Sequence, residues 1–259
     1  MEYTYRDLQP LTHRLRLLLH VAVAFNVMSL VSSGYQRSIF RQLIDGDVSD
    51  PVSFQVRAEA SDLAEMLISL PGVVLLLITF VFAGMWIHRA ARNVRAMGAH
   101  RLDCSPGWAV GWYFVPFACL LKPFQAMNEI WRASADPDRW EHLQTPGVLR
   151  LWWALWLISN ILGQAVFRLG LRAEELDELL RYNSVMMLDD LLSIPLNLVF
   201  AHVLTRIANM QAAQPSLLEL ELAPHPAHSH VKSKRGSALR DTLLARPACS
   251  RTIAALPFL

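Results

Sequence analysis

The sequence predicts an all-α integral membrane protein: a polytopic membrane helix bundle with four transmembrane helices plus a re-entrant or interfacial Trp-rich segment. Two observations lead to this fold class. Apolar residues make up 53% of the 259 residues and charged residues 18%, against roughly 45–50% and about 25% in soluble domains. Long uncharged runs also alternate with short charged stretches, as in a chain that crosses a bilayer several times. This composition excludes a disordered chain, a coiled coil and a disulfide-stapled secreted domain.

The predicted spans lie at about residues 15–33, 67–88, 150–171 and 186–207. A bilayer core of about 30 Å requires about 20 mostly apolar residues in a helix that rises about 1.5 Å per residue. A signal peptide is the alternative for the first run, but His20 and Asn26 interrupt its apolar stretch and favour an uncleaved span. The last run is the weakest, because only Leu191–Thr205 is free of charge. We therefore expect Asp189 and Asp190 near one membrane face.

The charges between the spans predict the orientation. Cytoplasmic loops of membrane proteins are enriched in Lys and Arg. Arginine is in excess in 88–105, Asp and Glu are in excess in 34–66 and 172–190, and 210–259 is again basic. We therefore expect both termini in the cytoplasm and a multi-pass protein of the cytoplasmic (inner) membrane.

The segment 106–135 is predicted to be re-entrant or interfacial. Its uncharged part, Pro106–Leu121, is short and broken by prolines. If 88–105 is cytoplasmic and 150–171 begins in the cytoplasm, this segment must enter and leave on the same side. All eight tryptophans then fall near the cytoplasmic boundary, where Trp is enriched in membrane proteins.

Residues 123–134 have the pattern of an amphipathic helix. Phe124, Met127 and Trp131 recur at helical spacing on one face. Two alternatives stay open: a helix that lies in the membrane interface, and an ordinary helix packed on the bundle. The pair Asp136-Pro137 is expected to end it.

Three stretches together carry a family resemblance: WIHRAARNVRAMGA (86–99), SPGWAVGWYFVPFACLLKPFQAMNEIWRASADP (105–137) and WWALWLISNIL (152–162). They resemble the domain-of-unknown-function 4328 family of bacterial integral membrane proteins, over about residues 67–207. The family-motif block consists of Pro106, Gly107, Trp108, Gly111, Trp112, Pro116, Pro123, Trp131 and Arg132. Where the family usually has a polar Asn and a Trp-Arg pair, this chain has Cys119, Leu121 and Lys122. The resemblance implies a membrane-embedded chain and supplies no chemistry.

A polar stripe runs along the last predicted span. Asp190, Ser193 and Asn197 follow one another at helical spacing. Shorter polar faces lie on two other spans and consist of Asn160 and Gln164, and of Asn26, Ser29 and Ser33. These side chains would either line a cavity for an ion or small solute, or hydrogen-bond from helix to helix and hold the bundle together.

Two further patterns concern packing and lipid. Gly107 and Gly111 have the small-xxx-small spacing that permits close helix packing, which we favour over a ligand-binding loop. The basic helix end, with His88, Arg89, Arg92 and Arg95, predicts attraction to anionic headgroups. Binding of a phosphorylated lipid or a nucleotide is the alternative for this end.

Residues 1–210 are predicted to form the membrane-embedded domain and 211–259 a disordered basic cytoplasmic tail. In the tail, His228 and His230 could bind a transition metal, but proline neighbours and the lack of Cys or carboxylate ligands favour solvated side chains. We therefore expect no metal and no cofactor.

The leading functional hypothesis is a non-enzymatic membrane module that acts through a protein partner or self-association. The alternative is a small transporter or channel subunit that uses the polar stripe. An enzyme is not expected, because the sequence contains no H-E-x-x-H, G-x-S-x-G or kinase motif. The expected partners are the lipid bilayer and either a second copy or a membrane protein, and the balanced net charge of +2 argues against nucleic acid.

Overall fold

The computed structural model describes residues 3–48, 50–173 and 175–222, with side chains described as far as residue 214. The elements in chain order are α1 (Gln9–Ile44), α2 (Pro51–Ala96), α3 (Pro106–Gly111), η1 (Trp112–Phe114), η2 (Ala118–Leu120), α4 (Lys122–Ala135), η3 (Trp140–His142), α5 (Gly147–Gly170) and α6 (Leu176–Leu222). Every regular element in these ranges is helical, which confirms the all-α class.

Three helices are long and apolar enough to cross a membrane: α1, α2, and α6 over Leu176–Gln214. The second of them has 46 residues and therefore a length of about 69 Å, more than twice the thickness of a bilayer core. The predicted loop 34–66 is mostly helix, because α2 starts as early as Pro51. There Asp50 caps the helix, and its Oδ1 accepts a hydrogen bond from the Val52 amide at 3.1 Å.

The remaining predicted span corresponds to α5, which has 24 residues. This helix is not among those that are apolar enough by composition, so four spans are not confirmed. Its Trp-rich start and the amides of Asn160 and Gln164 lower its hydropathy. It begins at Gly147 behind Pro146, and no side chain caps it.

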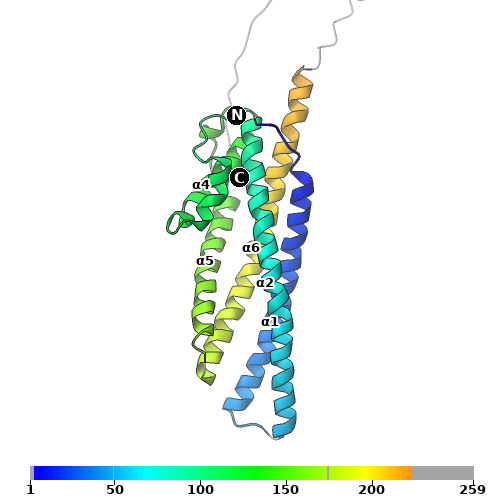
Figure 1. Cartoon of the computed structure of the whole chain (residues 1–259), viewed down its shortest axis with the longest axis vertical. Coiled ribbons are helices and arrows are strands. Elements are labelled where there is room, and N and C mark those ends of the chain that lie inside the picture. The colour runs from blue at the N-terminus through cyan, green and yellow to red at the C-terminus, as the bar shows by residue number, and fades with distance from the viewer. Residues whose placement is uncertain (1–2, 49, 174, 223–259) are drawn as a thin grey trace, which may run out of the picture. The chain divides into compact units, whose positions relative to one another are not determined.

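The four long helices pack in the spatial order α2, α1, α6, α5 (Figure 1). The connection from α1 to α2 and the connection from α5 to α6 lie toward one end of the bundle, which we call the turn end. Residues 97–146, which link α2 to α5, lie at the other end (Figure 1). We call this segment the connector and its end of the bundle the connector end.

The connector does not cross the bundle. Its α3 has six residues and η1 and η2 have three each, far fewer than the roughly 20 residues of a span. Helix α3 starts behind Ser105, whose Oγ accepts from the Trp108 amide at 3.3 Å. Helix α4 ends before Asp136, as predicted from the Asp-Pro pair. The segment thus leaves and re-enters the bundle at one end.

The connector holds Phe117 in a conformation that side chains rarely adopt. Its φ is 63°, and 86% of the residue is exposed. Backbone of this kind costs about 1–3 kcal/mol. The loop between η1 and η2 therefore presents an aromatic ring outward at an energetic cost.

The buried core lies at the connector end. Its large side chains come from every long helix and from α4, and include Leu15, Trp86, Met127, Leu149, Trp152 and Leu204. Helix α4 buries Met127 and Ile130 against α2 and α6. Residues 123–134 thus form a helix packed on the bundle, and their position relative to a membrane interface stays a prediction.

The tryptophans behave differently from interface anchors. All eight lie near or within the connector, but Trp86, Trp140, Trp152 and Trp153 are buried in the core. Trp86 Nε1 donates to Thr12 Oγ1 at 2.8 Å, and both groups are buried. From the sequence, the clustering of all eight tryptophans is attributed to the membrane interface. For these four, packing inside the protein accounts for their position.

Two other predictions need correction. Helix α6 continues to Leu222, so the predicted tail start at residue 211 falls inside a helix, and Gln211 is fully buried. The rest of the predicted tail, 223–259, lies outside the described residues. The close packing predicted for Gly107 and Gly111 is not found in the described chain. Gly107 faces open space, and the neighbour of Gly111 is the Trp108 ring of the same helix.

Candidate functional site

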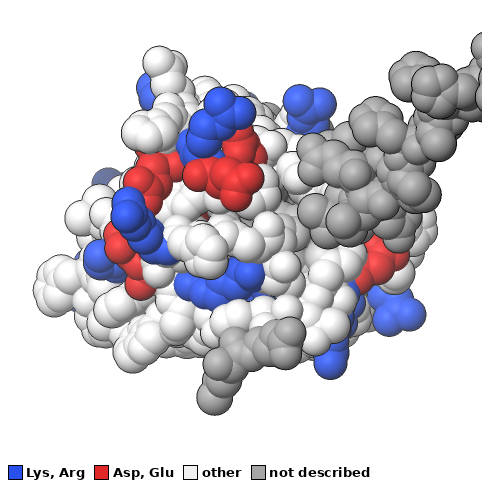
Figure 2. Space-filling model, turned by 90° about the horizontal axis from the view of Figure 1, so that it is seen from above, with Lys and Arg blue, Asp and Glu red and all other residues white. Residues whose placement is uncertain are grey.

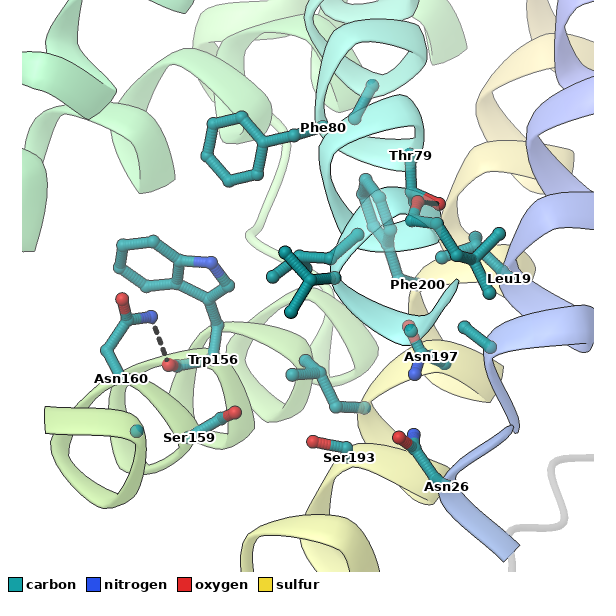
Figure 3. A pocket seen from close by; sticks show the side chains of 18 of the residues that line it. Leu19, Asn26, Thr79, Phe80, Trp156, Ser159, Asn160, Ser193, Asn197 and Phe200 are labelled. Carbon is teal, nitrogen blue, oxygen red and sulfur yellow. Dashed lines mark hydrogen bonds between the residues drawn. The ribbon is translucent and has the colours of Figure 1, made fainter. Parts of the chain in front are cut away.

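A hollow of about 950 Å³ lies between the four long helices. Helices α1 and α6 pack together behind it, and α2 and α5 flank it (Figure 3). Near the connector end it is bounded by Val110, Tyr113 and Phe114, and toward the turn end it reaches Asp189 and Asp190. We call this hollow the inter-helix cavity. Its size is in the range of small-molecule sites.

The polar stripe predicted on the last span lines this cavity: Asp190, Ser193 and Asn197 all contribute to its wall. The polar faces of two other helices converge on the same space through Asn26, Ser29, Asn160 and Gln164. In Figure 3, Ser159 of α5 points toward Ser193 of α6, and Asn26 of α1 lies beyond Ser193. Ser33, predicted on the same face as Asn26, is instead buried outside the cavity, where its carbonyl accepts from Asn183 Nδ2 at 3.1 Å.

The amides in the cavity do not hold the helices together. Asn26, Asn197 and Gln164 have no hydrogen-bond partner among the described residues, and Asn160 donates only to the Trp156 carbonyl of its own helix, at 2.7 Å. Polar groups of this kind lose free energy when they are shielded from water without a partner. Among the described residues these four amides therefore form no hydrogen bond from helix to helix.

Serines bond to the two carboxylates at the far end of the cavity. Ser29 Oγ of α1 donates to Asp190 Oδ2 at 2.7 Å, and Ser159 Oγ of α5 lies 3.5 Å from Asp189 Oδ1. A third carboxylate, Glu65 of α2, accepts from Ser32 Oγ at 3.0 Å. Serines of α1 and α5 thus bond to carboxylates of α2 and α6.

These carboxylates have no cationic partner within the described part of the chain. The ion pairs found there are Arg101–Glu141 and Arg139–Asp136, and both lie in the connector. Half-buried carboxylates without a counter-charge leave a negative potential in the cavity. The wall is therefore chemically suited to a cationic or hydrogen-bond-donating group.

Aromatic rings form the connector side of the cavity, and no pattern in the sequence indicated that they converge. Tyr113 meets Phe80 edge-on at 6.5 Å and Trp156 edge-on at 5.9 Å between ring centroids. Phe200 stacks on Trp152 at 5.3 Å. Apolar side chains in four separate segments look like ordinary core residues, so only the tertiary structure places them around one space.

The family-motif block lies beside the cavity, not in it. None of Pro106, Gly107, Trp108, Gly111, Trp112, Pro116, Pro123, Trp131 and Arg132 is among its lining residues. Trp108 and Trp112 pair at 4.5 Å between centroids. Arg132 lies 5.0 Å from the Trp140 ring centroid and donates to the Leu143 carbonyl at 3.2 Å. The motif therefore builds the connector.

One acidic side chain is buried inside the connector. Glu129 of α4 is 7% exposed, and its Oε2 accepts from the Cys104 amide at 3.3 Å. Burial raises the pKa of Glu129 above its usual range, although this hydrogen bond and the nearby Arg95 and Arg132 oppose the shift. Burial, together with the charge of Glu129, also raises the pKa of Cys104. The Arg95 guanidinium donates to the Cys104 carbonyl, so the contact fixes the connector to α2.

Within the described residues no group of three His, Cys, Asp or Glu side chains could hold a metal ion. His228 and His230 lie outside those residues.

Comparison with known proteins identifies the chain by family alone. No curated protein and no solved structure matches it. The family model described as Domain of unknown function (DUF4328) matches residues 50–209, which include α2, the connector, α5 and most of α6. The matched range carries the motif block and three of the four helices that line the cavity. The chain therefore belongs to the DUF4328 family of domains of unknown function.

Proposed function

We propose that this protein is a non-enzymatic membrane module that binds a small cationic solute with an apolar body, as a small transporter or channel subunit. The observation that carries the proposal is the convergence of polar faces from α1, α5 and α6 on the inter-helix cavity, with the Asp189 and Asp190 carboxylates free of any ion pair among the described residues. The aromatic walls suit the apolar part of such a solute, and ring faces attract cations.

The topology is part of the proposal. We place α1, α2, α5 and α6 across the cytoplasmic membrane, with the connector end in the cytoplasm. With its 24 residues, α5 is about 36 Å long, enough to cross a core of about 30 Å. Its outer face exposes Leu151, Ile158 and Ile161. The arginines of 88–105 at the connector end favour this orientation.

Binding of an aromatic cation tests the proposal directly. We expect the full-length chain in lipid nanodiscs to bind tetraphenylphosphonium saturably and to quench its tryptophan fluorescence, because Trp152 and Trp156 line the cavity. Replacing Asp190 by Asn should weaken binding at least about tenfold, or about 1.4 kcal/mol, because the charge is lost. The matched control is Asp177→Asn, an equal charge change at an exposed position of the same helix.

Two results would overturn the cation assignment. One is equal affinity in the Asp190→Asn variant and the unchanged chain. The other is equally tight binding of triphenylmethane, a neutral molecule of similar shape. Transport is a separate measurement: uptake of the same cation into proteoliposomes should fall to background in the Asp190→Asn and Asn197→Leu variants.

Self-association is the second candidate function, and the open side of the cavity favours it. Helices α2 and α5 pack against α1 and α6 and not closely against each other, so a second copy could close the cavity from this side. Light scattering of the detergent-solubilised chain should then give the mass of a dimer. A monomer at every concentration, with no other protein co-purifying, would refute this candidate.

A further inference from the structure

A second, smaller hollow of about 400 Å³ lies at the connector end, between residues 4–6 and the last turns of α2. Its charged and basic lining consists of Arg6, His88, Arg89 and Arg92. No Asp or Glu side chain lines it. We call this hollow the basic pocket. It is distinct from the carboxylate end of the inter-helix cavity, which lies toward the turn end.

Neutral groups hold the arginines of the basic pocket. Arg89 Nη1 donates to the Asp7 carbonyl at 3.3 Å, and the Arg92 guanidinium lies 5.9 Å from the Tyr3 ring centroid. Neither forms an ion pair in the described chain. Several positive charges therefore face one small space without compensation, which is unfavourable unless an anion or solvent occupies it.

Hydrogen bonds to a buried side chain of α2 fix the backbone that shapes the basic pocket. Asn93 of α2 is fully buried. Its Oδ1 accepts from the Arg6 amide at 3.0 Å, and its Nδ2 donates to the Arg6 carbonyl at 2.8 Å. Gln211 of α6 in turn accepts from Asn93 Nδ2 at 2.9 Å. The backbone at Arg6 is thus held against α2, so the pocket is preorganised.

One wall of the basic pocket is apolar. It consists of Gly84, Met85 and Val110, which also line the inter-helix cavity. One turn further toward the turn end, α2 exposes Val81, which is 62% accessible. An occupant with a charged group among the arginines can therefore extend an apolar chain along α2 toward the membrane-spanning part of the helix.

We propose that the basic pocket binds the phosphate of an anionic phospholipid, with an acyl chain lying along α2 beyond Met85. Guanidinium groups match phosphate oxygens in geometry and charge, and basic pockets of this kind at the cytoplasmic ends of helices bind lipid headgroups. Figure 2 views the connector end, where Asp and Glu side chains gather mainly on one side of the face while Lys and Arg are spread more widely.

The test measures lipid affinity of the full-length chain by native mass spectrometry from detergent. The probes are phosphatidylglycerol, phosphatidylcholine, glycerol phosphate and inorganic phosphate. We expect phosphatidylglycerol to bind most tightly, and the Arg89→Gln/Arg92→Gln variant to lose at least about tenfold in affinity. The matched control is Arg14→Gln/Arg16→Gln, the same change of charge at exposed positions of α1 outside the pocket.

A single variant keeps the test valid if the double variant fails to fold. Arg6→Gln changes an exposed side chain with no hydrogen bond of its own in the described chain, and should weaken phosphatidylglycerol binding at least about threefold. Equal losses in the pocket and control variants would overturn the site. Equal affinity for phosphatidylglycerol and glycerol phosphate, with the same dependence on arginine, would overturn the lipid and assign the pocket to a soluble phosphate.

Discussion

Replacement of Gln211 by Leu tests whether buried hydrogen bonds hold the connector to the bundle. Gln211 is fully buried on α6. Its Oε1 accepts from Asn93 Nδ2 at 2.9 Å, and its Nε2 donates to the Ala90 carbonyl at 3.2 Å and to Ser134 Oγ at 3.0 Å. One side chain thus joins α6 to both α2 and α4.

The magnitude follows from these contacts. Three hydrogen bonds at about 1 kcal/mol each predict a loss of about 3 kcal/mol in the free energy of unfolding. Two of the abandoned partners keep another bond, which limits the cost. Asn93 still donates to the Arg6 carbonyl, and Ser134 still donates to the Ile130 carbonyl. Leucine has nearly the volume of glutamine, so no large cavity adds to the loss.

Equilibrium unfolding in mixed dodecyl maltoside and sodium dodecyl sulfate micelles, followed by tryptophan fluorescence, gives the measurement. The matched control is Gln214→Leu, the same substitution one turn away. Gln214 is partly exposed and bonded only to the Ala135 carbonyl at 3.4 Å, so its variant should stay within about 0.5 kcal/mol. Equal stability of the two variants would refute the reasoning that the buried network stabilises the connector end.

Three further predictions concern other parts of the chain. In the same unfolding assay, Thr12→Val should lower the free energy of unfolding by about 2 kcal/mol, because Trp86 Nε1 loses its partner inside the core. Thr205→Val is the control, since Thr205 bonds only within its own helix. Equal losses in the two variants would contradict the role of the Trp86 bond. Because burial raises the pKa of Glu129, the folded chain binds this proton more tightly than the unfolded chain does. Its contribution to stability is full below the ordinary pKa of 4.5 and is lost as the pH rises through the raised folded value. The melting temperature of the unchanged chain should therefore fall as the pH rises, and that of Glu129→Gln should lack this fall. Parallel curves of melting temperature against pH for the two chains would contradict the contribution of Glu129. A cysteine at Asp138, in a chain without the three native cysteines, should react with impermeant maleimide only from the cytoplasmic side of cells; labelling from outside would reverse the proposed topology.

Hydropathy was sufficient to predict the helical class and the long apolar helices, because a bilayer imposes a length and a composition on each span that a sequence displays directly. The loop charges, together with the prolines that interrupt residues 106–121, also indicated that this segment does not cross the membrane. Helix ends were harder to predict. Charged residues such as Glu59 and Asp62 are typical of loops between membrane spans. A helix that extends into water also tolerates charged side chains, and α2 starts at Pro51.

For the candidate site, too, the sequence predicted local relations and only the tertiary structure decided the distant ones. Helical spacing showed that Asp190, Ser193 and Asn197 share one face, because local geometry alone fixes that relation. Which faces meet is decided by how α1, α2, α5 and α6 pack, and only the tertiary structure brought the aromatic rings of the connector and of α5 to the same cavity. The burial of Gln211 could not be predicted for the same reason. A glutamine in a polar stretch is typical of a linker, and only the tertiary structure places its partners, Asn93 and Ser134, beside it. Those partners are distant in sequence, and hydrogen bonds between distant residues leave no periodic pattern in the chain.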